Sequence, residues 1–280
     1  MFMIASTPRG HRCIAGSLLL VFTGWTLPAY AQPRSAQSII DLAVARAEEQ
    51  RESHADIGFE AMLEAVTEHL DGDGAVKKVE WSTYRQYPLE GLVYEELVAK
   101  DGEPLDDADA RSELKRREGF IETVRERRAN EEPPRGEGDN QVEFNEEFVS
   151  RYDFRIVGEE EVDSHSCWVI ALAPRPGHLP VRRRIDHALN NSTGHLWVSQ
   201  DDYGLVLFEF EMVKSVRFWG GILGTLRNTV GRLEFTRVAE RVWVPTTIDI
   251  KLDLRIVFRS IRQRIVREWA DYAPFRVTDE

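Results

Sequence analysis

Apolar and charged residues alternate one by one between Ile248 and Ile256. Isoleucine or leucine occupies every even position of this stretch, and aspartate, lysine or arginine occupies every odd one. Successive side chains of a β-strand point to opposite faces, so this period of two predicts a strand with one apolar and one solvated face. The apolar face must be covered by another layer.

Other segments repeat the pattern and predict an antiparallel sheet. Alternation recurs from Val206 to Met212, and the segments 59–70 and 76–87 flank the turn sequence Asp-Gly-Asp-Gly, which predicts a hairpin. Every residue from Cys167 to Ala173 is apolar, as in a central strand that is buried on both faces. The chain is therefore predicted to be mainly β.

Two segments predict helices. Residues 38–52 place apolar side chains at helical spacing, with Ser38 as the expected cap. Residues 104–128 begin with aspartates and end with arginines, which suits the helix dipole, and carry few apolar residues. With the proline- and glycine-containing linker at 130–141, this second segment is expected to be a charged helical insertion at about 104–141.

The N-terminus has the pattern of a secretory signal peptide. Arg9 and Arg12 precede an apolar run at 14–27, and Ala29-Tyr30-Ala31 provides a small-x-small cleavage site. We expect cleavage after residue 31, a single domain at 32–280, and a soluble periplasmic protein of a bacterium. An uncleaved membrane anchor is the alternative, although the apolar run is short for a span.

The charge of the chain argues against a nucleic-acid partner. The net charge is −12, and the acidic residues concentrate in the amino-terminal half, whereas residues 175–280 are mildly basic. We interpret this uneven distribution of charge as two solvated faces of the protein. A charged surface that docks a partner is the alternative. Peripheral contact with a membrane is compatible with the basic half.

Catalytic and metal-binding signals are weak, so no enzymatic activity, cofactor or metal site is expected. His165 and Cys167 share one face of a predicted strand and could act as base and nucleophile, but a cysteine opening a buried strand usually behaves as a small hydrophobe. The carboxylates at 159–161 are interpreted as a solvated strand end, and the arginines at 182–184 as charges that protect an edge strand, with an anionic partner as the alternative. The histidines show no metal-ligand spacing.

The segment 218–226 is the candidate ligand site. Its glycines argue against a regular strand, and its apolar side chains argue against a solvated loop. We therefore weigh an apolar ligand pocket against a loop folded inward as ordinary core. The expected ligand-binding residues are Phe218, Trp219, Ile222, Leu223 and Leu226, together with Phe208 and Phe210 of the sheet.

The chain also resembles a known family in the order of its segments and in local sequence. The runs that carry the likeness are Gly194 to Met212, Val242-Trp243-Val244-Pro245 and Trp269 to Phe275. They resemble the periplasmic lipoprotein-localisation superfamily typified by LolA, LolB and RseB, including outer-membrane lipoprotein-sorting proteins. The charged segment 104–141 departs from that pattern, and no residue here is matched to the arginine that holds the family's lid.

The resemblance implies a fold and a function. The expected fold is an incomplete, half-open antiparallel β-barrel with helices plugging its concave face. The expected function is non-catalytic binding or transport of lipid or of lipoprotein acyl chains in an apolar cavity. The alternative is an envelope-stress or assembly factor that recognises a protein partner through the same sheet face.

Overall fold

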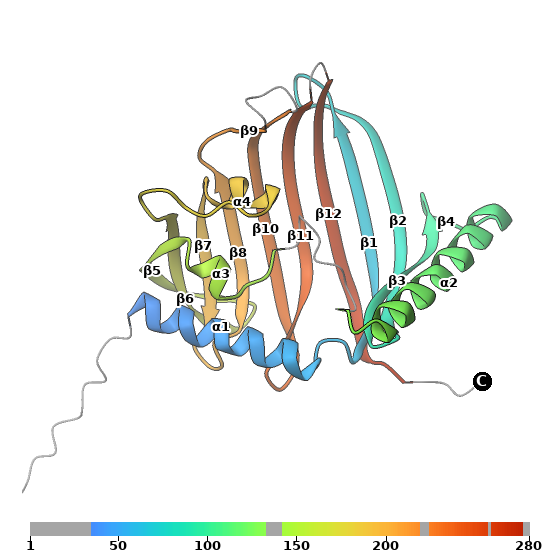
Figure 1. Cartoon of the computed structure of the whole chain (residues 1–280), viewed down its shortest axis with the longest axis horizontal. Helices are drawn as coiled ribbons and strands as arrows, with labels where there is room; N and C mark the ends of the chain where they lie inside the picture. Colours follow the sequence, from blue (N-terminus) through green and yellow to red (C-terminus); the bar gives the residue numbers. More distant parts are fainter. Residues whose placement is uncertain (1–34, 133–141, 219–223, 257–258, 277–280) are drawn as a thin grey trace, which may run out of the picture. The chain divides into compact units, whose positions relative to one another are not determined.

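The computed structural model describes residues 35–132, 142–218, 224–256 and 259–276, which all belong to the unit formed by residues 34–280. The described residues form a twelve-stranded sheet and four helices (Figure 1). The helices are α1 (Ala36–Ser53), α2 (Asp107–Ala129), α3 (Glu146–Val149) and α4 (Arg184–Leu189). The strands are β1 (Phe59–Leu70), β2 (Val76–Leu89), β3 (Leu92–Lys100), β4 (Glu103–Pro104), β5 (Tyr152–Val162), β6 (His165–Pro174), β7 (Ser192–Ser199), β8 (Leu205–Met212), β9 (Val216–Phe218), β10 (Gly224–Ala239), β11 (Val242–Ile256) and β12 (Arg259–Pro274).

The strands follow one another in an open path. Their order is β4-β3-β2-β1-β12-β11-β10-β8-β7-β6-β5, with β9 paired to β10, and the pairs are antiparallel. The two end strands of this path, β4 and β5, do not pair with each other, so the sheet is not closed. The predicted fold class, an open antiparallel sheet accompanied by helices, is confirmed. The predicted hairpin of β1 and β2 is also present.

Cross-strand pairing defines two faces of the sheet. Leu196, Phe208, Leu233 and Ile248 pair in succession from β7 to β11, so they share the face that we call the inner face. The preceding or following residue on each strand belongs to the opposite, outer face, which carries the charged residues of the alternating pattern.

Helix α1 covers the inner face at the β5–β8 end. Its Ile39 and Ile40 are fully buried against Ile170 of β6 and Leu196 of β7, and Phe148 of α3 joins the same cluster. Figure 1 shows α1, α3 and α4 on one side of these strands. We call this region the covered end. The helix starts at Ala36, two residues before the predicted Ser38, because the side chain of Ser35 caps it by accepting a hydrogen bond from the Ser38 amide.

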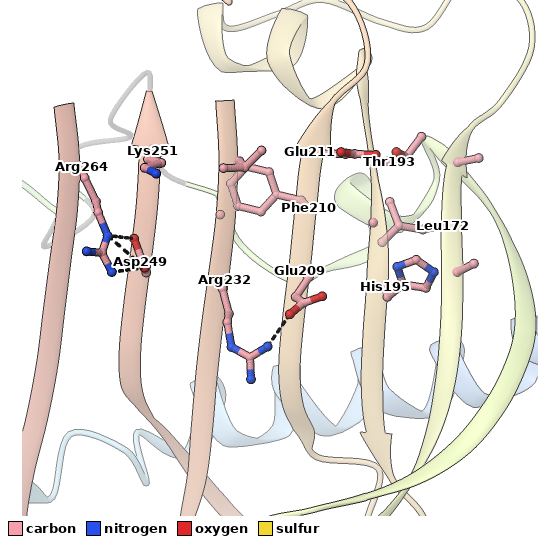
Figure 2. Close-up of a pocket in the computed structure, with 15 residues that line it drawn as sticks. Leu172, Thr193, His195, Glu209, Phe210, Glu211, Arg232, Asp249, Lys251 and Arg264 are labelled. Carbon is pink, nitrogen blue, oxygen red and sulfur yellow. Dashed lines mark hydrogen bonds and ion pairs between the residues drawn. The ribbon is translucent and has the colours of Figure 1, made fainter. Parts of the chain in front are cut away.

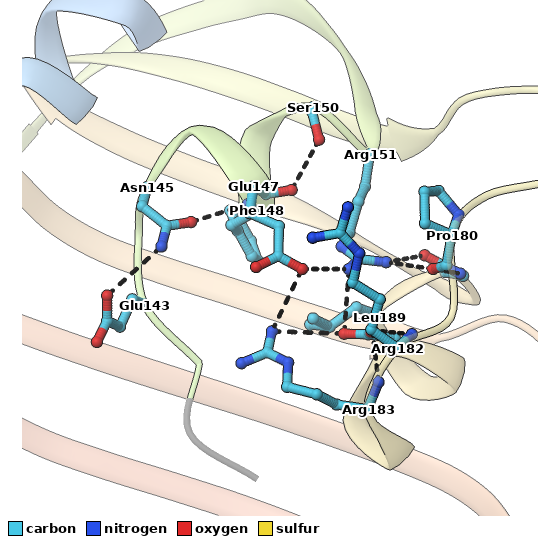
Figure 3. Close-up of polar contacts among 12 residues, drawn as sticks. Glu143, Asn145, Glu147, Phe148, Ser150, Arg151, Pro180, Arg182, Arg183 and Leu189 are labelled. Carbon is cyan, nitrogen blue, oxygen red and sulfur yellow. Dashed lines mark hydrogen bonds and ion pairs between the residues drawn. The ribbon is translucent and has the colours of Figure 1, made fainter. Parts of the chain in front are cut away.

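A buried ion network fixes α3 and α4 at the covered end (Figure 3). The guanidinium of Arg151 donates to Glu147 of α3 at 3.0 Å and lies 3.1 Å from Asp186 of α4, with both Arg151 and Asp186 almost fully buried. Asp186 also accepts from the backbone amides of Arg182 and Arg183. The prediction that the arginines at 182–184 guard an edge strand is wrong, since they precede and begin α4.

The sheet curls toward its inner face between β12 and β3. Arg267 of β12 forms a 2.7 Å ion pair with Glu95 of β3, although β1 and β2 lie between these strands. On a flat sheet, strand spacing and register would separate the two Cα atoms by roughly 20 Å, which exceeds the reach of the two side chains. The inner face is therefore concave here.

Helix α2, which forms the predicted charged segment, packs on the outer face of β3. Gln86 of β2 lies on the inner face, where it accepts a hydrogen bond from Trp269. The next residue, Tyr87, therefore lies on the outer face, and so does Tyr94 of β3, which pairs with it. The hydroxyl of Tyr94 donates to Glu113 of α2 at 2.8 Å, and Phe120 packs on its ring. No helix among the described residues is long and apolar enough to cross a membrane.

Candidate functional site

The inner face changes character beyond the covered end. From β8 to β12 it carries a continuous set of apolar side chains that stay partly exposed, unlike Leu196 and Ile170, which are fully buried. We call this region the open inner face. Its members are Phe210, Met212, Leu226, Leu233, Ile248, Ile250, Leu252, Leu254, Ile261 and Ile265.

Phe208 joins the covered end to the open inner face. Its ring meets Phe148 of α3 edge-on, with 6.0 Å between centroids, and it lies 5.4 Å from the ring of Phe210. Of these predicted ligand-binding residues, Phe208 therefore packs against the covering helices and Phe210 belongs to the open inner face.

Gly231 sets the position of the Phe210 ring. A Cβ atom at Gly231 would lie 2.3 Å from a ring carbon of Phe210, so the ring occupies the space above this glycine. Gly231 pairs with Phe210 on β8 and with Ile250 on β11. Because no side chain stands between these two residues, an aromatic and an aliphatic group lie on either side of one backbone position.

The predicted ligand segment 218–226 contains more strand than expected. Phe218 ends β9 and pairs with Gly224, which begins β10. Leu226 pairs with Val216 and Leu254, and it lies on the open inner face. Trp219, Ile222 and Leu223 lie outside the described residues, so their expected role stays a prediction.

Polar side chains border the open inner face on β12 and β1. The side-chain Nε2 of Gln263 lies 3.2 Å from Nδ1 of His69. Arg267 forms its ion pair with Glu95 of β3 on the same face. Trp269 donates its indole N–H to Gln86 at 2.7 Å. An amphiphile on the open inner face would thus find an apolar surface with hydrogen-bonding groups along one border.

The outer face has a hollow of a different kind. Its volume is about 820 Å³, and it crosses strands β6 to β12 opposite α1 (Figure 2). Small residues such as Ala171 and Gly194 form part of its floor. The charged residues that line it are Glu209, Glu211, Arg232, Asp249, Lys251 and Arg264.

The charges of this hollow are largely paired with one another. Arg264 binds Asp249 at 2.8 Å, and Arg232 forms ion pairs with Glu209 and Glu234. Covering such pairs with a hydrocarbon chain would remove their hydration with no new polar partner in exchange. The open inner face is therefore the better candidate for an apolar ligand.

The environment of Cys167 does not favour a nucleophile. The residue is fully buried, and burial raises the pKa of its thiol to about 11, which disfavours the reactive thiolate. Its sulfur contacts the backbone oxygen of His165 at 3.3 Å, while the His165 ring lies against Trp243 at 4.9 Å. Among the described residues no group of three or more His, Cys, Asp or Glu could hold a metal ion.

Sequence reasoning missed two features of the site. The curl that brings Arg267 to Glu95 depends on contacts between distant strands, which alternation does not encode. The extent of the open inner face was missed as well, because the alternation predicts which residues share a face and not which part of that face a helix covers. The available signal was the apolar face of β11, whose even positions from Ile248 to Ile256 contain no lysine or arginine.

Comparisons with known proteins concern the fold. No protein-family model and no curated protein sequence matches the chain. Among solved structures, the chain is similar to a LolA superfamily protein from Nitrosomonas europaea, with 13% identity, 88% of this chain and 96% of that chain covered, and a TM-score of 0.33.

Two further structures are similar. A putative outer membrane lipoprotein-sorting protein domain from Vibrio parahaemolyticus has 10% identity over 86% of this chain and 95% of that one, with a TM-score of 0.31. MucB, in its complex with MucA(peri), has 12% identity over 86% of this chain and 100% of that one, with a TM-score of 0.25. The fold described above rests on the strand order and register of the chain itself.

Proposed function

We propose that the protein is a non-catalytic carrier that binds acyl chains of a lipid or lipoprotein on the open inner face. The observation that supports this most is the partial exposure of apolar side chains at the centre of the sheet, on the long strands β10, β11 and β12. Monomeric proteins rarely expose large contiguous apolar patches that have no function.

The energetics of this binding need no specific chemistry. Burying a hydrocarbon chain contributes about 0.8 kcal/mol per methylene group, so several methylenes on Ile250, Leu252 and Ile265 suffice for measurable affinity. The curl between β12 and β3 supports the proposal because it brings polar groups to one border of the apolar surface.

We place this function in the periplasm. The secretory pattern of residues 1–31 supports export. The acidic composition argues against a protein that binds nucleic acid. The buried thiol of Cys167 supports a role without covalent catalysis.

The test is the binding of a fluorescent fatty acid to matched variants. Ile250→Asp puts a carboxylate on the open inner face, and Lys251→Asp puts the same group on the outer face one residue further along β11. We expect Ile250→Asp to weaken binding at least tenfold and Lys251→Asp to leave it within twofold, since desolvating a carboxylate opposes hydrocarbon burial. Equal effects of both variants, or none from Ile250→Asp, would refute the proposal.

The same assay addresses the protein-partner alternative. If the wild-type protein bound no fatty acid but bound an apolar peptide in an Ile250-dependent manner, the open inner face would be a partner site in place of a lipid site. Circular dichroism and thermal unfolding of each variant show whether lost binding comes from lost folding.

A further inference from the structure

The two ends of the strands differ in charge. The connections from β8 to β9 and from β11 to β12 lie at the same end of the strands (Figure 1). In the described part of the chain, these two connections and the strand residues beside them include four exposed basic residues. They are Lys214, Arg217, Arg255 and Arg259. We call this the basic end.

Pairing places two of these residues close together. Arg217 of β9 and Arg255 of β11 both pair with Thr225 of β10, from opposite sides, so they share one face about 10 Å apart. Arg259 pairs with Ile256 at the start of β12. The basic side chains therefore gather at one end of the strands.

These cations differ from the other arginines of the same strands. Arg232, Arg262 and Arg264 each form an ion pair with a carboxylate of the sheet. In contrast, the ion pairs found among residues 35–132, 142–218, 224–256 and 259–276 include none of the four basic-end side chains. Their charge is available to an external anion.

The opposite end of the strands is acidic. The turns that join β5 to β6, β7 to β8 and β10 to β11 carry Asp163, Asp201 and Glu240, all exposed. The end of α1 adds Glu52 there, since Gln50 bonds the backbone of Trp243 at the start of β11. A protein of net charge −12 thus has a basic end and an acidic end along its strands.

Exposed apolar side chains accompany the basic residues. Val213 is 51% exposed beside Lys214, and Ile256 is 41% exposed beside Arg255. The nearby turn between β1 and β2 adds no net charge, because Asp71 and Asp73 are matched by Lys77 and Lys78. Basic groups mixed with exposed aliphatic ones suit a lipid surface, where charges meet headgroups and apolar groups enter the interface.

We propose that the basic end docks the protein on an anionic membrane surface. An acidic protein that approaches such a membrane is repelled by its acidic end and attracted by its basic end, so the strands would orient with Lys214, Arg217, Arg255 and Arg259 toward the lipid. This inference goes beyond the proposed function and does not require that the open inner face hold a ligand.

The test is co-sedimentation of the protein, purified from the periplasm of an expression host, with vesicles. One set of vesicles contains equal parts of phosphatidylglycerol and phosphatidylcholine, and the other contains phosphatidylcholine alone. Each basic residue near such a surface is worth about 1 kcal/mol, a factor of roughly five. We expect Lys214→Gln/Arg217→Gln to weaken binding to the anionic vesicles by roughly 25-fold.

A double variant on α2 is the control. Arg111 and Lys115 are also exposed and basic, so Arg111→Gln/Lys115→Gln changes the net charge equally at another site. Binding that is equal for both vesicle types, or that falls equally in both double variants, would overturn the proposal. Fatty-acid binding by the same variants is expected to stay within twofold, which separates failure here from failure of the proposed function.

Discussion

Two regions of one sheet face share a sequence pattern and differ in what lies above them. Leu196 and Leu233 flank Phe208 in the same cross-strand row, but Leu196 is fully buried under the helices and Leu233 is partly exposed. The covered end is held by α1, α3 and the Arg151 network. The difference teaches that an apolar strand face can serve as core at one end and as a binding surface at the other.

The largest effect is expected where the cover is anchored. Arg151→Met removes the buried cation beside Asp186 and leaves that carboxylate with the amides of Arg182 and Arg183 and the more distant Arg183 guanidinium at 3.4 Å. Breaking a buried ion pair by removing one partner typically costs about 3–5 kcal/mol of unfolding free energy. Chemical denaturation monitored by tryptophan fluorescence measures the loss. Arg241→Met, which removes an exposed ion pair with Glu49, is the control and should cost less than about 1 kcal/mol. Similar losses in both variants would show that α3 and α4 are not anchored by this network.

The two leucines of the shared row give the next largest effect. Leu196→Ala should cost about 2–5 kcal/mol because it opens a cavity in packed core. Leu233→Ala should cost less, since part of its side chain is already in water, and it should weaken fatty-acid binding instead. Denaturation and binding titrations of both variants check this. A reversed order in either measurement contradicts the division of the face.

A smaller effect is expected from the glycine beneath Phe210. Gly231→Ala introduces a methyl group into the space of the Phe210 ring and should cost about 1–3 kcal/mol through overpacking. Gly119→Ala in α2, where the added methyl meets no atom within 4 Å, should instead stabilise the protein by about 0.5–1 kcal/mol. Thermal unfolding distinguishes the signs. Stabilisation by Gly231→Ala would show that Phe210 is not held over this residue.

The mildest test changes only pH. Burial alone would raise the pKa of Asp186, but the amides of Arg183 and Arg182 and the charge of Arg151 lower it below its ordinary value. A carboxylate whose pKa is lowered in the folded state stabilises the fold at pH values above its ordinary pKa. This contribution is lost as the pH falls through the pKa of the folded state. Denaturation between neutral and acidic pH should therefore show a steeper loss in the wild type than in Asp186→Asn. Parallel curves would contradict the lowered pKa.

Much of the fold could be predicted because the alternation is local. The strand β11, the β1–β2 hairpin and the buried strand β6 each follow from periodicity and turn residues within one segment. The segment 218–226 was harder. Its glycines suggested a loop, yet Gly224 begins β10 and Phe218 ends β9, because pairing with neighbouring strands outweighs the weak strand preference of glycine.

The candidate site depended on contacts that the sequence does not state. Phe208 and Phe210 were both predicted to bind ligand from their shared alternation, and only the position of α3 separates them. Among the described residues Arg217 and Arg255 form no ion pair, and this likewise depends on where the carboxylates of other strands lie. Periodicity assigns a residue to a face, whereas cover and charge pairing are properties of the assembled sheet.

The most direct test of the carrier proposal is photo-crosslinking with a fatty acid that carries a diazirine near the end of its chain, followed by peptide mapping. The account predicts labelled residues on the open inner face of β10 to β12, around Ile250, Leu252 and Ile265, with excess unlabelled fatty acid abolishing the signal. Labels confined to the outer hollow around Arg232 and Lys251, or spread without competition over the surface, would contradict it.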